Sequence, residues 1–227
     1  MRLRDFINEE VMNKIIDCVG RVSMNSRDTY TALQDDTVDG LLGGVTKMVT
    51  GYVPFGLASR LGLSGSNTPP VRVAGDIDEA FGRLPDPEIA VLLMSYEFSH
   101  ANKAFSLAFI RAKGLLGGET PFGVFLSLTS YLTTQQSRSL RATLYSRLAI
   151  FIIRHLIDDS SLMALLQHED TKSKIRICRQ RQPSLPLVSK ERKLVEGILD
   201  ICVGGIDHNL RRRLDVELYE YALSSAI

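Results

Sequence analysis

The sequence lacks the features that most enzyme and metal sites require. Its four histidines are scattered, and none belongs to an HExxH pattern or to a Cys/His cluster of the kind that binds zinc. No GxSxG segment presents a serine nucleophile, and neither Gly43-Gly44 nor Gly117-Gly118 is followed by the Gly-Lys-Ser/Thr of a phosphate loop. We therefore expect a non-enzymatic protein without a cofactor or a metal ion.

Cysteine and long apolar runs are also scarce. Cys18, Cys178 and Cys202 lie far apart and form no CxxC pair, which excludes a disulfide framework and indicates a reducing compartment. No run of about 18 uninterrupted apolar residues exists, so we expect no transmembrane helix. The first ten residues are interrupted by acids where a signal peptide needs its apolar stretch. These absences predict a cytoplasmic protein, or one peripheral to a membrane on its cytosolic side.

Neither sign of charge is in large excess. The net charge is +1, with 23% charged and 44% hydrophobic residues, which are ordinary globular values. A dedicated nucleic-acid binder usually carries a strong basic excess. Aromatic residues that could stack on bases are not interleaved with the arginines either. We therefore expect no nucleic-acid partner.

The N-terminal part, residues 1–85, combines one helix with a glycine-rich and proline-rich segment. Apolar residues at helical spacing predict an amphipathic helix over residues 5–24, with Val11, Ile15, Cys18 and Val22 on its core side. Residues 40–63 are apolar and nearly uncharged, but their six glycines each cost a helix about 1 kcal/mol. This stretch is either a partly helical, partly disordered segment over the core or a shallow membrane-inserting segment.

The second part, residues 86–227, carries the strongest helix signals. Helices are predicted to begin at six positions: Asp86, Thr120, Ser139, Asp158, Ser189 and Asn209. The first is expected to break near Ser99-His100. The second is expected to bury one face, made of Phe122, Phe125, Leu126, Thr129 and Leu132. The third is expected to bury one stripe, made of Leu140, Leu144, Leu148, Phe151, Ile152 and Leu156.

Period-two patterns are almost absent from the sequence, so we predict an all-α fold. Successive amphipathic helices with short turns favour an armadillo/HEAT-like α-solenoid of paired antiparallel helices, although no clean internal repeat is present. The chain reaches Ile227 without a helix stop signal, which predicts a solenoid truncated there or completed by a partner.

Basic residues gather in two places. A basic segment runs from Lys172 to Arg181, and at helical spacing Lys172, Arg176 and Arg179 would share a face. Arg211-Arg212-Arg213 would open the last helix, where the positive dipole end disfavours cations. The arginines either pair with acids inside the protein or meet an acidic surface, from a partner protein or anionic lipid. The candidate partner-binding residues are Arg179, Arg181, Arg211, Arg212 and Arg213.

Several motifs resemble a known family. They are Glu119-Thr120-Pro121-Phe122, the run from Phe125 to Leu132, Cys178-Arg179-Gln180-Arg181-Gln182-Pro183, Leu185-Pro186-Leu187-Val188, and the run from His208 to Tyr219. In this order, over residues 86–221, they resemble the armadillo-like helical domain-containing proteins, once grouped as a domain of unknown function in fungi.

The resemblance implies an α-solenoid without enzymatic activity on the cytosolic side of the Golgi. It also implies protein partners in membrane traffic, namely a phosphatidylinositol 4-kinase and the exchange factor that activates Arf GTPases. The sequence thus leaves two hypotheses. One is a helical scaffold or adaptor that uses the arginine surface. The other is a peripheral membrane-binding module that uses residues 40–63 and a basic face.

Overall fold

A computed structural model describes residues 3–6, 8–34, 74–114, 118–178 and 190–212. Within these ranges the regular elements are all helices, which confirms the all-α prediction. The α-helices are α1 (Glu9–Gln34), α2 (Ala74–Arg83), α3 (Val91–Ala101), α4 (Lys103–Arg111), α5 (Pro121–Gln135), α6 (Leu140–Asp158), α7 (Ser160–Leu166) and α8 (Leu194–Arg212). The 3-10 helices are η1 (Leu3–Asp5), η2 (Pro87–Ala90), η4 (Gln136–Arg138) and η5 (Glu169–Thr171). The predicted solenoid arrangement stays a prediction.

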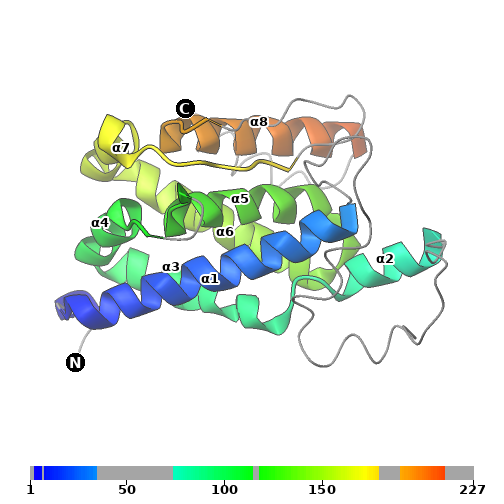
Figure 1. Ribbon diagram of the computed structural model, residues 1–227, viewed down its shortest axis with the longest axis horizontal. Helices are drawn as coiled ribbons and strands as arrows, with labels where there is room; N and C mark the ends of the chain where they lie inside the picture. Colours follow the sequence, from blue (N-terminus) through cyan, green and yellow to red (C-terminus); the bar gives the residue numbers. More distant parts are fainter. Residues whose placement is uncertain (1–2, 7, 35–73, 115–117, 179–189, 213–227) are drawn as a thin grey trace.

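Helix α5 lies at the centre, in contact with α1, α4, α6 and α8 (Figure 1). The Thr120 hydroxyl caps it by accepting from the Gly123 amide, and Pro121 occupies its first turn. Every residue from 121 to 133 is buried. The predicted burial of Phe122, Phe125 and Leu126 is confirmed, but burial is not confined to one face, because hydroxyl residues including Ser127 and Ser130 are buried as well.

Helix α1 packs along α5 and is longer than predicted. The sequence predicted a helix over 5–24, and the helix spans Glu9–Gln34. Its predicted core face is displaced by one residue, since Met12, Ile16 and Val19 are buried whereas Val11 and Cys18 are exposed. The buried face continues through polar residues that an apolar pattern cannot reveal: Ser23, Ser26, Arg27 and Thr31.

The structure corrects both the predicted start and the predicted break of the helix after Asp86. Asp86 precedes the 3-10 turn η2 and makes no side-chain capping bond, so the predicted cap is wrong. The break lies at Asn102 rather than at Ser99-His100. The Asn102 side chain accepts from the Phe105 amide at 3.1 Å and donates to the Phe6 carbonyl at 2.5 Å. These bonds hold the backbone extended between α3 and α4.

The C-terminal helices confirm one predicted start and correct three others. Ser139 caps α6 as predicted, whereas Asp158 is the last residue of α6 and α7 begins at Ser160 with Asp159 as its cap. Helix α8 begins at Leu194, not Ser189, because the backbone of Arg192 pairs with Ser173 in an antiparallel bridge. No separate helix begins at Asn209, since α8 runs without interruption to Arg212.

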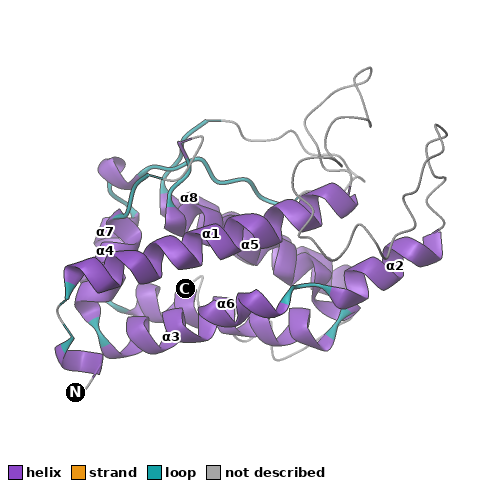
Figure 2. Cartoon of the chain, turned by 60° about the horizontal axis from the view of Figure 1, so that its bottom comes forward, coloured by secondary structure: helices purple, strands orange, loops and turns teal. Residues whose placement is uncertain are grey.

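The helices form layers around α5 (Figures 1 and 2). Helix α8 covers one side of α5, α1 and α6 pack on other sides, and α3 packs against both α1 and α6. Helices α5 and α6 are joined by the short η4 and pack as an antiparallel pair. The predicted division between residues 1–85 and 86–227 stays a prediction, and residues 40–63 lie outside the described ranges.

Candidate partner-binding surface

The predicted arginine surface falls mostly beyond the described residues. Arg179, Arg181 and Arg213 lie outside them, and for Arg211 and Arg212 only the backbone is described. That backbone belongs to α8, far from its first turn. Arg211 and Arg212 therefore do not lie at a helix start, which corrects the prediction that they oppose the dipole there. Their role in partner binding stays a prediction.

The described part of the basic segment, residues 172–178, forms an extended strap rather than a helix. Burial alternates along it. Ser173, Ile175 and Ile177 are buried. Between them, Lys172 and Lys174 are exposed, and Arg176 and Cys178 are half-buried. An extended chain turns alternate side chains to one face. The basic residues from 172 to 176 therefore share a face with period two, which corrects the helical spacing assumed from the sequence.

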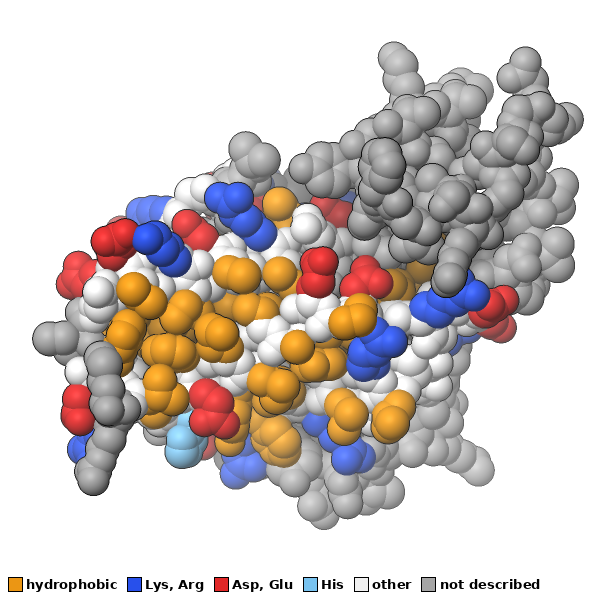
Figure 3. Space-filling view, turned by 90° about the horizontal axis from the view of Figure 1, so that it is seen from below, with side chains coloured by type: hydrophobic (Ala, Val, Ile, Leu, Met, Phe, Trp, Pro, Cys, Tyr) orange, Lys and Arg blue, Asp and Glu red, His pale blue; other side chains and the backbone are white. Residues whose placement is uncertain are grey.

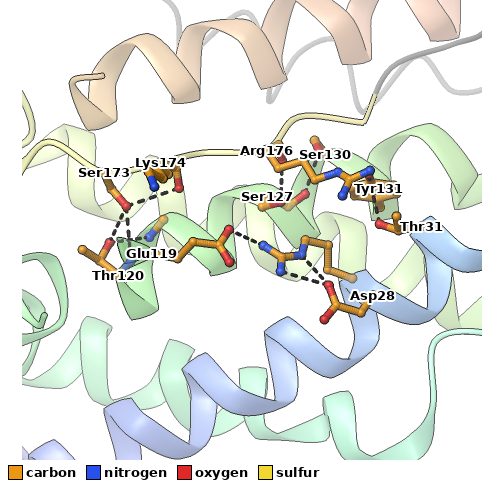
Figure 4. A network of polar contacts seen from close by, with 12 residues as sticks. Asp28, Thr31, Glu119, Thr120, Ser127, Ser130, Tyr131, Ser173, Lys174 and Arg176 are labelled. Carbon is orange, nitrogen blue, oxygen red and sulfur yellow. Dashed lines mark hydrogen bonds and ion pairs between the residues drawn. The ribbon is translucent and has the colours of Figure 1, made fainter. Parts of the chain in front are cut away.

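Hydroxyl groups of α5 hold the backbone of the strap (Figure 4). The Ser127 hydroxyl donates to the Arg176 carbonyl, and the Cys178 amide donates to the Ser130 hydroxyl at 2.8 Å. From Ser173 to Cys178 an extended chain advances about 17 Å, and from Thr120 to Ser130 a helix advances about 15 Å. The similar lengths keep the strap in register with α5.

Two glycines let the strap lie between α5 and α8. A Cβ atom at Gly123 would collide with the Ser173 hydroxyl and lie 3.1 Å from the Ser173 Cβ. A Cβ atom at Gly197 would lie 2.6 Å from the Cδ1 of Ile175. At the start of α5, the Ser173 hydroxyl accepts from the Thr120 amide at 3.2 Å. The strap is thus a packed layer of the core.

A buried ion pair fixes α1 to the start of α5. Arg27, whose side chain is 7% exposed, contacts Glu119 at 2.5 Å and Asp28 at 2.9 Å. Burial alone would lower the pKa of Arg27, but its bonds to the two carboxylates outweigh this and raise the pKa. This arginine is therefore a structural residue.

Lysines beside the strap are also paired. Glu169 contacts Lys172 and, at 2.9 Å, Lys193. Hydrogen bonds from Lys172 and then from Lys193 lower the pKa of Glu169 to about 2. The carboxylate therefore offsets part of the positive charge at this end of the strap.

The exposed large hydrophobic side chains mark a different surface. We call it the lower face, and it is built on α3 and α6 with a contribution from η1 and α1. The residues and their exposed fractions are Leu93 52%, Met94 46%, Leu140 75%, Leu144 54%, Leu3 40% and Val11 38%. Figure 3 shows the hydrophobic side chains gathered in a band across this side of the molecule.

Sequence reasoning found part of this surface but placed it on the wrong side of its helix. Leu140 and Leu144 were expected in the core but are exposed. Ile152 and Leu156 of the same predicted stripe are buried, together with Ala142, Ala149 and Ile153. Helix α6 therefore carries apolar residues on two faces. The available signal was that the helix has more apolar residues than one face can hold.

The described residues give no sign of a metal centre. Among them, no three His, Cys, Asp or Glu side chains lie close enough together to hold a metal ion. The rings of His100 and His155 lie 5.3 Å apart, and His155 Nε2 lies 3.0 Å from the Ser99 carbonyl oxygen, at the junction of α3 and α6. Over the same parts of the chain, no helix combines the length and the apolar character needed to cross a membrane.

Comparisons with known proteins give one informative match. The chain is similar to the UPF0588 membrane protein of Schizosaccharomyces pombe, with 30% identity over 217 residues. The match covers 96% of this chain but 33% of the yeast protein, so the chain spans about a third of its relative. No protein-family model matches the chain. No solved structure matches it either.

Proposed function

We propose that this chain is a non-enzymatic helical scaffold that binds partner proteins. The observation that carries the proposal is the lower face, where four large side chains on α3 and α6 are about half exposed or more. Fully burying one such side chain contributes about 1.5–3 kcal/mol. Contiguous apolar patches on a folded surface mark interaction sites.

The armadillo/HEAT-like solenoid is the finer form of this proposal. In such folds, antiparallel helix pairs stack and bury a shared stripe. The antiparallel pair α5–α6 supports that arrangement. The resemblance adds a setting: Golgi membrane traffic, with a phosphatidylinositol 4-kinase and an Arf exchange factor as partners.

A binding experiment with purified proteins tests the adaptor function. The intact chain is immobilised and offered the kinase or the exchange factor, alongside the variant L140E/L144E and a variant with Arg211, Arg212 and Arg213 changed to Glu. We expect the wild type to capture at least one partner and the leucine variant to lose it. V203E, an exposed site on α8, is the matched control, and circular dichroism checks that each variant is folded.

The arginine variant separates the two proposed surfaces. Loss of capture with a retained fold would support the arginine surface that the sequence predicted. Unchanged capture would remove Arg211 to Arg213 from the binding site. Wild-type protein that captures neither partner contradicts the proposed adaptor function.

The second candidate is a peripheral membrane-binding module that uses residues 40–63 and a basic face. Its specific support is the relative in Schizosaccharomyces pombe, which is described as a membrane protein. Co-sedimentation with anionic liposomes tests it, and binding should weaken as salt rises, because the attraction of basic residues to anionic headgroups is screened. Equal sedimentation with and without liposomes would rule this candidate out.

A further inference from the structure

We propose that the lower face binds a second copy of this chain, in a twofold dimer that lays α3 of each copy over α6 of the other. The proposal rests on the proposed function in one respect, namely that the lower face binds protein. It goes further by naming the partner. Three features of α3 and α6 lead to it: their direction, their apolar residues and their charges.

Helices α3 and α6 run parallel, and contacts near their two ends have the same sequence separation. At one end Arg141 donates to the Pro85 carbonyl at 2.9 Å, and at the other His155 lies 3.0 Å from the Ser99 carbonyl oxygen. Both pairs are separated by 56 residues in sequence. A twofold axis along the helices, in the plane of the face, preserves their direction. It therefore places each residue of α3 opposite the α6 residue 56 positions later.

This register brings apolar side chains together. Leu93 comes level with Ala149 and so beside Leu148 of the second copy. Met94 comes beside Phe151. Leu93 and Met94 are about half exposed, and Leu148 and Phe151 are half-buried, so each still has surface to lose. An isologous contact uses every such pair twice.

The same register brings opposite charges together. The segment η2–α3 carries Glu88 and Glu97 and no lysine or arginine, whereas α6 carries Arg141, Arg147 and Arg154 against one acid, Asp158. Glu97 comes level with position 153, next to Arg154 of the second copy. Arg154 is 40% exposed and its contact with Asp158 is long, at 3.8 Å. The charges therefore complement each other across the axis.

These charges favour a second copy over other occupants. An anionic membrane would be repelled by the glutamates of α3, and a uniformly acidic or basic protein would match only one of the two helices. A second copy related by the twofold axis places its basic α6 over the acidic α3 and its acidic α3 over the basic α6. An amphipathic helix of another protein is the competing occupant, and the experiment below distinguishes it.

Sedimentation velocity of the intact chain tests the dimer. We expect the wild type to be dimeric when its concentration is raised to about 100 µM. L93E and L148E place a charge in the apolar contact between Leu93 and Leu148 and should weaken association at least about tenfold. V203E on α8 is the matched control and should leave the dimer unchanged. Circular dichroism and thermal melting confirm that each variant is folded.

A charge exchange tests the orientation. E97R and R154E should each weaken the dimer, and the double variant E97R/R154E should recover much of the loss, because it restores opposite charges across the axis. Recovery is a result that general destabilisation cannot give. A double variant no better than the single ones overturns the proposed orientation.

Failure of the dimer and failure of the adaptor function give different results. Wild type that stays monomeric overturns the dimer, and so does a dimer that persists in both leucine variants. If the wild type is monomeric and L140E/L144E loses capture of the kinase or exchange factor, the face serves a foreign helix and the adaptor function stands. A dimer that captures neither partner supports the self-association and contradicts the adaptor function.

Discussion

Replacing Gly123 with alanine tests whether the strap is clamped against α5. A methyl group there would collide with the Ser173 hydroxyl and lie 3.0 Å from the Thr120 Oγ1. Ser173 cannot simply move aside. Its hydroxyl accepts from the Thr120 amide, and its backbone pairs with Arg192. Accommodating the methyl group must therefore shift the strap or break the bonds that hold it.

Three effects decide the magnitude. Overpacking a well-packed site costs about 1–3 kcal/mol, and losing a buried hydrogen bond costs about 1 kcal/mol more. Alanine is favoured over glycine inside a helix by about 1 kcal/mol, which acts in the opposite direction. We expect G123A to lower the free energy of unfolding by about 2 kcal/mol.

Urea denaturation followed by far-UV circular dichroism measures this change. Gly204→Ala in α8 is the matched control, because a Cβ at Gly204 meets nothing within 4 Å. The control should gain stability, by up to about 1 kcal/mol, from helix propensity alone. If G123A is as stable as G204A, the strap does not press on α5 and the reasoning fails. S173A added to G123A should recover part of the loss, since it removes the hydroxyl from the collision.

Three further predictions concern charge and cysteine chemistry. Glu119→Ala should cost about 3 kcal/mol in urea denaturation, because it leaves the buried α1 arginine without its main partner, whereas Asp28→Ala should cost less than about 1 kcal/mol; equal losses would contradict this. The pKa of Glu169 is lowered to about 2, so its contribution to stability is present above its ordinary pKa and disappears as pH falls toward 2. The difference in melting temperature between wild type and Glu169→Gln should therefore shrink over that interval, and a difference independent of pH would refute it. With a thiol reagent, exposed Cys18 should react well before buried Cys202, whose pKa burial raises to about 11; equal rates would show that α8 opens readily.

Local signals in the sequence located several helix starts correctly. Thr120 and Ser139 are capping residues whose effect depends on the next three positions alone, and both cap as predicted. The break at Asn102 was misplaced because its cause is distant in sequence. The Asn102 amide bonds the carbonyls of Leu3 and Phe6, about a hundred residues away. Contacts of that kind leave no trace in local periodicity.

The strap shows how a short pattern can be misassigned. Its basic residues at positions 172 and 176 fit both a helical period and a period of two, so spacing alone could not decide between them. The alternating residues Ser173, Ile175 and Ile177 favoured an extended chain. What made that conformation stable was the set of hydroxyls on α5, which satisfy its backbone groups in place of a second strand. A run of Ser and Thr on a buried helix is therefore a signal for such a neighbour.

The lower face could not be predicted because periodicity reports an apolar stripe and not what covers it. Leu140 and Leu144 repeat at helical spacing, and an exposed apolar stripe has the same spacing in the sequence as a buried one. What distinguishes them is that α6 already buries a second stripe, through Ala149 and Ile153, against the rest of the fold. Each apolar stripe of a helix needs a neighbour, and the described neighbours of α6 leave Leu140 and Leu144 exposed. The uncovered apolar stripe is the physical basis for expecting a protein partner on the lower face. The opposite charges of α3 and α6 indicate that the partner carries the same two helices.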